Sequence, residues 1–264
     1  MWNMLKALWR YRGFVLSSIR NEFASRFARS KLGGLWMIIH PLAQVAIFAL
    51  VLSNVLAAKL PGIENKNAYA LYLMAGMLAW NLFAELINRC LGLFIEQGGV
   101  MKKMYFPRIT LPTIVVGTSL LTYFLLFLSI LAIFSLLGQF PDWQALWIVP
   151  LTFIVVALAL GLGLILGILN VFLRDIGQVV PVVMQILFWL TPVVYPASII
   201  PEEFKHFLNY NPMYPVVTAY QNVLVYKTPP ELESLGIIAA VSLGMMLLGL
   251  FIFRRASPEL VDVL

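Results

Sequence analysis

Long apolar stretches alternate with short polar connections along almost the whole of this 264-residue chain. A helix needs about 20 apolar residues to cross the ~30 Å hydrocarbon core of a bilayer, and lipid forces each segment to pair its own backbone groups. The pattern therefore predicts an all-α integral membrane protein with six transmembrane helices. They cover roughly residues 35–58, 69–95, 111–138, 146–172, 179–195 and 235–253, within a single transmembrane domain of residues 35–264.

Composition and charge agree with this prediction. Hydrophobic residues make up 61% of the chain and charged residues 11%, against about 25% charged in a typical soluble domain. Most lysines and arginines lie before the first stretch, between the second and third, and after the sixth. The positive-inside rule then places both termini in the cytoplasm. The net charge of +6 thus reflects topology, and it favours membrane lipids over nucleic acid as the partner.

Residues 1–34 are predicted to form a cytoplasmic amphipathic interface helix. Val15, Ile19, Phe23 and Phe27 recur every fourth residue, opposite a polar, mostly cationic face that includes Glu22. Such a helix lies flat at a membrane surface. It either anchors the topology or offers a docking surface to a cytoplasmic protein.

The inside loop 96–110 is too short for a domain, yet glycine and proline bound a short helix within it. Its surface combines aromatic and cationic side chains, which suits contact with a cytoplasmic protein. An ordinary positively charged loop is the alternative. The residues proposed to couple to a partner are Lys102, Lys103, Tyr105, Phe106 and Arg108.

Seven prolines divide the outside segment 191–233 into pieces too short to span a bilayer, although it remains rich in valine and aromatic residues. Irregular backbone at membrane depth is tolerated only where protein or a water-filled cavity surrounds it. The segment is therefore predicted to form short re-entrant or interfacial helices that act as a gate, with simple structural packing as the alternative. The expected gate residues are Pro192, Tyr195, Pro196, Asn211 and Pro212.

Within the spans, Glu85 and Arg89 are four residues apart on one helical face, where they can neutralise each other. The pair is either structural, or Arg89 contacts a phosphate of a substrate. Gly161, Gly163 and Gly167 have the spacing of close helix packing. No metal site is expected, since the two histidines are predicted at opposite faces and the acids are scattered.

Several short motifs, in this order, resemble permeases of the type-2 class of ABC exporters, specifically those that export O-antigen, capsule or teichoic-acid polysaccharides. They are the run from Arg29 to Trp36 with Pro41 after it, the turn from Phe172 to Ile176, Leu190-Thr191-Pro192-Val193-Val194-Tyr195-Pro196, and Leu208-Asn209-Tyr210-Asn211-Pro212. The resemblance covers essentially the whole chain and names no particular glycan.

The resemblance implies a homodimer that binds two copies of a separate ABC ATPase, with the substrate channel between the permease halves and loop 96–110 as the coupling helix. The chain has no phosphate-binding loop of the form G-x-x-x-x-G-K-[ST], so it is expected to need no cofactor and to leave Mg-ATP to the partner. Aromatic rings are expected to line the glycan path. Trp36, Phe48, Phe188 and Trp189 lie on the implied dimer-facing spans, and Tyr72 and Trp80 lie on the second span.

The leading hypothesis is the channel-forming subunit of an ATP-driven exporter that moves lipid-linked polysaccharide across the inner membrane. A drug or lipid exporter of the same fold is an alternative. A polytopic membrane enzyme acting on a lipid substrate is another, but no cluster of acids, histidines or nucleophiles supports it. A secondary transporter would carry more intramembrane charges and internal repeats.

Overall fold

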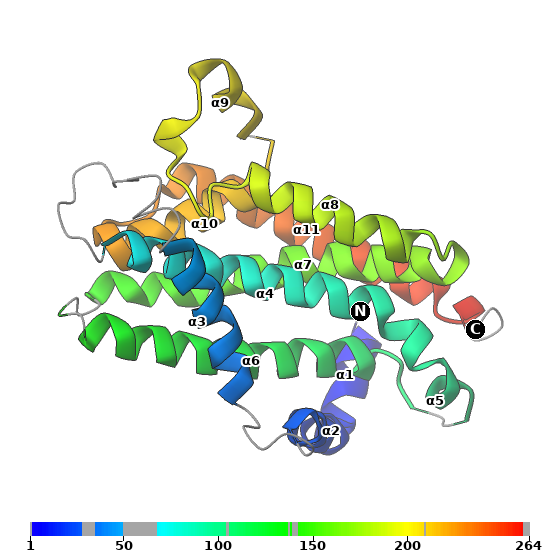
Figure 1. Cartoon of the computed structure of the whole chain (residues 1–264). Coiled ribbons are helices and arrows are strands. Elements are labelled where there is room, and N and C mark those ends of the chain that lie inside the picture. Colours follow the sequence, from blue (N-terminus) through cyan, green and yellow to red (C-terminus); the bar gives the residue numbers. More distant parts are fainter. Residues whose placement is uncertain are drawn as a thin grey trace.

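Helices make up nearly all of the regular structure in the computed structural model, which describes residues 2–27, 35–49, 68–103, 106–136, 138, 142–208 and 210–260. No strand occurs within these ranges, which confirms the predicted all-α class for the described chain. The longer helices run side by side along a common direction (Figure 1). In chain order the α-helices are α1 (Trp2–Arg10), α2 (Arg12–Phe27), α3 (Trp36–Ala49), α4 (Ala68–Glu96), α5 (Gly98–Lys103), α6 (Thr110–Leu136), α7 (Ile148–Phe172), α8 (Ile176–Leu190), α9 (Glu202–Leu208), α10 (Met213–Gln221) and α11 (Leu232–Ala256).

Four segments within the described residues are long and apolar enough to cross a membrane. They are α4, α6, α7 together with the preceding 3-10 turn η3 (Trp143–Trp147), and α11. These four confirm that the chain is a multi-pass membrane protein. Helix α3 contains Pro41 and covers the first part of the predicted first span, while residues 50–58 of that span lie outside the described residues.

Helix α8 is apolar but has only 15 residues, and the prediction that the fifth stretch is helical as far as Tyr195 was wrong. The helix ends at Leu190, and Thr191 has the extended angles φ −98° and ψ 130°. Thr191 precedes Pro192, whose ring disfavours the helical conformation of the residue before it. The chain therefore leaves the helix at the start of the proline-rich segment.

Helix α4 forms the centre of the bundle. It packs against α7 and α6 along its length and also contacts α3, α8 and α10, whereas α11 packs on α7. In its most apolar stretch 78% of α4 is buried, against 22% for α11. The exposed apolar faces of α6 and α11 suit contact with lipid.

Glycines allow α7 to approach its two neighbours closely, as the small-residue spacing predicted. A methyl group at Gly163 would lie 2.7 Å from Cys90 Cβ, and one at Gly167 would lie 2.3 Å from the Cys90 carbonyl oxygen of α4. On the other side, Gly161 faces the backbone of α11 near Met245 and Gly249. Side chains at these positions would push the three helices apart.

Helices α1 and α2 lie at the same end of the bundle as α5 and the C-terminal end of the chain (Figure 1). Helix α2 packs on α6, where the Ile19 side chain occupies the space that a side chain at Gly117 would need. Val15, on the predicted apolar face, is 6% exposed. The amphipathic N-terminal segment is therefore part of the packed structure, and it is divided into two helices at Tyr11.

The proline-rich segment forms short helices, as predicted. After α8 come the 3-10 turn η4 (Ala197–Ile199), α9, α10 and the π-helical turn η5 (Asn222–Tyr226). Helix α9 projects from the side of the bundle (Figure 1). Helix α10 instead packs against α4 and α7, and its Val216, Val217 and Tyr220 are completely buried.

Candidate functional site

Arg89 of α4 joins three helices near the end of the bundle that carries α5. Its guanidinium forms an ion pair with Glu22 of α2. It also donates hydrogen bonds to α6, at the Val115 carbonyl oxygen (3.1 Å), the Thr118 hydroxyl and Ser119 Oγ (3.1 Å). Side chains from two other helices therefore surround this intramembrane cation.

Glu85, the partner that the sequence suggested, lies one turn away, with its Oε1 3.9 Å from Arg89 Nη1. It also accepts a hydrogen bond of 3.1 Å from Ser119. The closer partner, Glu22, was missed because helical spacing finds pairs only within one helix, and Glu22 is 67 residues away in the chain. Its acidity on a mostly cationic face was the signal that could have found it.

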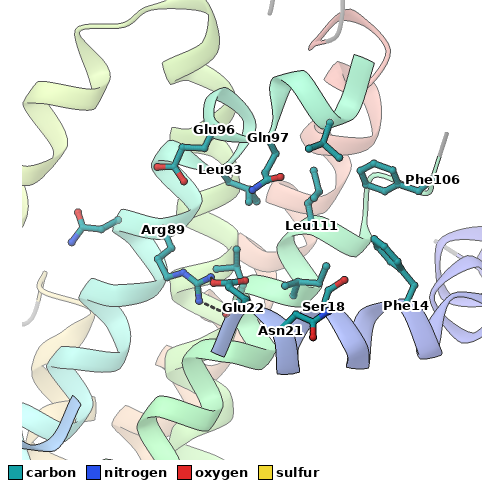
Figure 2. Close-up of a pocket in the computed structure, with 14 residues that line it drawn as sticks. Phe14, Ser18, Asn21, Glu22, Arg89, Leu93, Glu96, Gln97, Phe106 and Leu111 are labelled. Carbon is teal, nitrogen blue, oxygen red and sulfur yellow. Dashed lines mark hydrogen bonds and ion pairs between the residues drawn. The ribbon is translucent and has the colours of Figure 1, made fainter. Parts of the chain in front are cut away.

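A cavity of about 640 Å³ opens beside this network, between α2, α4, α5 and α6. Figure 2 shows Arg89 and Glu22 at one edge and the rings of Phe14 and Phe106 at the other. The described lining carries two carboxylates, on Glu22 and Glu96, and a single cation that is already engaged. This balance makes the cavity a poor site for an anion, and it favours a structural role for Arg89 over contact with a phosphate.

The C-terminal part of the loop 96–110 contacts other parts of the protein. The Phe106 ring packs against Phe14 of α2 with 5.9 Å between ring centroids. Arg108 Nη1 donates a hydrogen bond of 3.2 Å to Ser257 Oγ, just beyond α11. These two members of the proposed coupling set therefore connect the loop to α2 and to the C-terminal end.

The same loop has an exposed part, α5, which is the short helix that the sequence predicted. Lys102 and Lys103 are exposed in its last turn, while Met101 is buried beneath them. Tyr105 lies outside the described residues. Among the described members of the coupling set, the two lysines are the ones available to a partner.

The aromatic residues proposed for the glycan path occupy two kinds of position. Trp36 of α3 and Trp189 of α8 are 51% and 53% exposed, whereas Trp80 of α4 is 6% exposed. The Phe188 ring packs against both Trp80 and Trp189, with 5.4 Å between ring centroids to Trp80 and 5.5 Å to Trp189. Three of the rings are thus gathered between α4 and α8.

Two smaller cavities meet at α4, and both are lined by Asn81 and Ala84. One, of about 310 Å³, lies between α3, α4 and α6 and includes Trp36. The other, of about 320 Å³, lies between α4 and α8 and includes Trp80, Gln185, Phe188 and Trp189. Sequence reasoning missed the amides of Asn81 and Gln185, although a polar side chain within an apolar helix was a usable signal.

Tyr72 is 4% exposed and helps to anchor the proline-rich segment 191–233. Its hydroxyl donates to the Tyr195 carbonyl oxygen (3.3 Å), and the neighbouring Tyr69 hydroxyl donates to the Val194 carbonyl oxygen (2.6 Å). The Tyr195 hydroxyl in turn donates to the carbonyl oxygen of Trp189 (2.6 Å). Phe48 lies in α3, but its side chain is outside the described residues.

The two proline-containing pieces of the segment 191–233 for which a gate was predicted are also hydrogen-bonded to each other. Asn211 Nδ2 donates to Thr191 Oγ1 at 2.8 Å, and its Oδ1 accepts from the Met213 backbone at 3.0 Å. Gln221 of α10 donates to the Pro192 carbonyl oxygen at 3.1 Å. Of the remaining gate residues, Pro196 precedes η4 and Pro212 precedes α10.

A buried triangle of hydroxyl groups, not anticipated from the sequence, holds α10 to the bundle. Tyr123 of α6, Thr152 of α7 and Tyr220 of α10 lie 2.9–3.0 Å from one another. Because the Thr152 hydroxyl donates its one hydrogen to the Ile148 carbonyl oxygen at 2.7 Å, it serves as an acceptor for the tyrosine hydroxyls. Within the described residues, no group of three or more His, Cys, Asp or Glu side chains is placed to hold a metal ion.

Comparison with known proteins gives matches along most of the chain. The sequence model of the ABC-2 type transporter family matches residues 14–225, from α2 into η5. The O-antigen export system permease protein RfbA of Myxococcus xanthus is 28% identical over 264 residues, which cover 99% of each chain. A protein of the same name from Klebsiella pneumoniae is 27% identical over 90% of each chain. The polysialic acid transport protein KpsM of Escherichia coli is 23% identical over 91% of this chain and 92% of its own.

We expect a double-mutant cycle to assign the main partner of Arg89. Glu22→Gln and Glu85→Gln, each alone and with Arg89→Gln, are compared by thermal unfolding of the purified protein in detergent. Side chains in direct contact couple by about 0.5–3 kcal/mol, so the Glu22–Arg89 coupling should exceed the Glu85–Arg89 coupling. Arg20→Gln, on the exposed face of α2, is the control. Stronger coupling to Glu85 would restore the single-helix pairing.

Proposed function

Because the chain belongs to the ABC-2 type transporter family, we propose that it is the channel-forming subunit of an ATP-driven exporter that moves lipid-linked polysaccharide across the inner membrane. The observation that carries this proposal is the similarity, over at least 90% of the chain, to permeases named for export of O-antigen and transport of polysialic acid. A transport subunit of this kind passes its substrate on chemically unchanged, so no catalytic residues are assigned.

The topology proposed is six spans with both termini in the cytoplasm. Helices α3 and α8 supply the first and fifth spans. With 15 residues α8 reaches about 22 Å at 1.5 Å per residue, so the buried turn 191–195 must complete the crossing. Lys102, Lys103, Arg254 and Arg255 lie at the end of the bundle that holds both chain ends (Figure 1), as expected for the cytoplasmic side.

Energy for transport comes from a separate ATPase, since the chain has no phosphate-binding loop. Two copies of that ATPase bind Mg-ATP and dock on a homodimer of this chain. The docking surface is α5 with α2 behind it. This choice is supported by the exposed lysines of α5 and by the Phe14–Phe106 contact, which links the docking loop to α2.

We expect Lys102→Glu with Lys103→Glu to detach the ATPase without unfolding the permease, because both lysines are exposed. Co-purification of a tagged permease with the ATPase measures the effect. The control is Arg254→Glu with Arg255→Glu, which makes the same change in net charge in the last turn of α11. Equal loss of the ATPase from both variants would indicate a general charge effect and contradict docking at α5.

The glycan path runs along α3, α4 and α8. Sugars present apolar C–H faces that stack on aromatic rings and hydroxyls that hydrogen-bond to amides. Trp36, Phe188 and Trp189 supply rings beside the two cavities, and Asn81 and Gln185 supply amides. Exposed apolar side chains elsewhere on α8 then face the second copy of the chain. The segment 191–233 closes the outer end of the path as its gate.

A strain that lacks this chain tests the function directly. It should lose its surface polysaccharide and accumulate the lipid-linked precursor in the cytoplasm, and the intact chain should restore both. Normal surface polysaccharide in the deletion strain would contradict the proposal. A drug or lipid exporter would instead change drug resistance or lipid composition. The similarity to named transport permeases disfavours an enzyme acting on lipids.

In the same strain, Trp36→Leu and Trp189→Leu should each lower export severalfold, because leucine keeps bulk and apolarity but removes the ring. Export is measured as the amount and length of surface glycan, with permease level and ATPase binding checked in parallel. Trp143→Leu is the control, since Trp143 is 68% exposed but lies in η3, away from both cavities. Unchanged export in both path variants would refute the aromatic path.

A further inference from the structure

A cavity of about 610 Å³, to which none of the roles above assigns a ligand, opens between α10 and α11. It lies beside the first turns of α11, at the opposite end of that helix from Arg254 and Arg255. Helix α10 packs chiefly against α4 and makes few contacts with α11. The two helices are joined by η5 and the short link 227–231, and the groove between them remains open.

The groove has a charged, polar end at the start of α11 and an apolar wall farther along that helix. At the polar end, Ser234 Oγ donates a hydrogen bond of 2.8 Å to Glu231 Oε2, and Asn222 faces them from η5. Val241 follows Glu231 by ten residues, about 15 Å along a helix. The apolar wall on α11 consists of Ile237, Ile238 and Val241.

Charge selects the ligand that the polar end can accept. Among the described residues that line the groove, Glu231 is the only one with a formal charge. Its carboxylate favours a cation at the membrane surface. An apolar wall that begins within about two turns of this carboxylate, on a helix long enough to span the bilayer, favours an acyl chain below that cation.

We propose that the groove binds one phospholipid with an ammonium headgroup from the outer leaflet, an assignment of side that rests on the topology proposed above. The ammonium pairs with Glu231, and one acyl chain lies along Ile237, Ile238 and Val241. The N-cap residue of α11 is Glu231 itself and the first turn also carries Glu233, so the charge at this helix start favours the ammonium over the phosphate.

A saccharide fits this groove less well, although two tyrosines line it. Sugar hydroxyls point outward around the whole ring and need partners along the full length of a site. At the deep end, the Asn211 amide already donates to Thr191 Oγ1 at 2.8 Å and accepts from the Met213 backbone at 3.0 Å. Its hydrogen-bonding groups are therefore engaged away from the groove.

The test is native mass spectrometry of the purified permease in detergent, titrated with phosphatidylethanolamine or phosphatidylglycerol. The intact chain should bind phosphatidylethanolamine about fivefold more tightly, the ratio given by a partly exposed ion pair of about 1 kcal/mol. Glu231→Gln should bring that ratio close to one. Glu233→Gln is the matched control, since Glu233 is exposed in the same turn of α11 but does not line the groove, and it should keep the ratio.

Ile237→Trp provides a second variant, because Ile237 is 64% exposed in the apolar wall and a larger ring there should block the acyl chain. Loss of the bound phosphatidylethanolamine in this variant supports the site. Equal binding of both lipids by the intact chain, or an unchanged ratio in Glu231→Gln, overturns it, as does binding of a soluble oligosaccharide in place of lipid. The measurement needs neither the ATPase nor export, so its failure is distinct from failure of the proposed function.

Discussion

Every backbone polar group that this chain removes from water needs a partner inside the protein, because lipid offers none. Regular helices satisfy this constraint along α4, α6, α7 and α11. Where a helix ends within the bundle, side chains must provide these partners instead. At the turn after α8, the carbonyl oxygens of Pro192, Val194 and Tyr195 accept hydrogen bonds from side chains of α4 and α10. Hydrogen-bond donors on α4 and α10 thus stabilise the irregular backbone of this turn within the bundle.

A similar constraint organises the end of the bundle that carries α5. A single arginine in an apolar helix is costly, and Arg89 is stabilised by Glu22, Glu85 and the oxygen atoms of α6. One consequence is mechanical. Helix α2 cannot move away from α4 without separating Glu22 from Arg89, and separating a partly buried ion pair costs more than separating an exposed one. Displacement of the loop 96–110, which contacts α2 through Phe14, is therefore transmitted to the centre of the bundle.

How much could be predicted depended on whether the deciding interaction was local in sequence. The spans that became α4, α6, α7 and α11 follow from run length alone, and the glycines of α7 follow from their spacing. Proline identified the segment 191–233 as short pieces, although the effect of Pro192 on Thr191 was overlooked and the fifth stretch was drawn too long. The Glu22–Arg89 pair, the hydroxyl triangle and the burial of Tyr72 and Trp80 depend on which helices become neighbours, and one sequence does not specify that.

The way the outer segment is anchored constrains how a gate made from it could open. From the sequence, the proline-bounded pieces could shift as separate units. In the structure the turn 191–195 is held by Tyr69, Tyr72 and Gln221, and Asn211 binds Thr191. A carbonyl oxygen left unpaired at membrane depth costs several kcal/mol. A movement of the turn away from α4 and α10 would leave several carbonyl oxygens unpaired together. A movement of the turn with α4 and α10 as one body breaks none of these bonds. In the homodimer proposed above, opening by displacement between the two copies is therefore favoured over rearrangement within one copy.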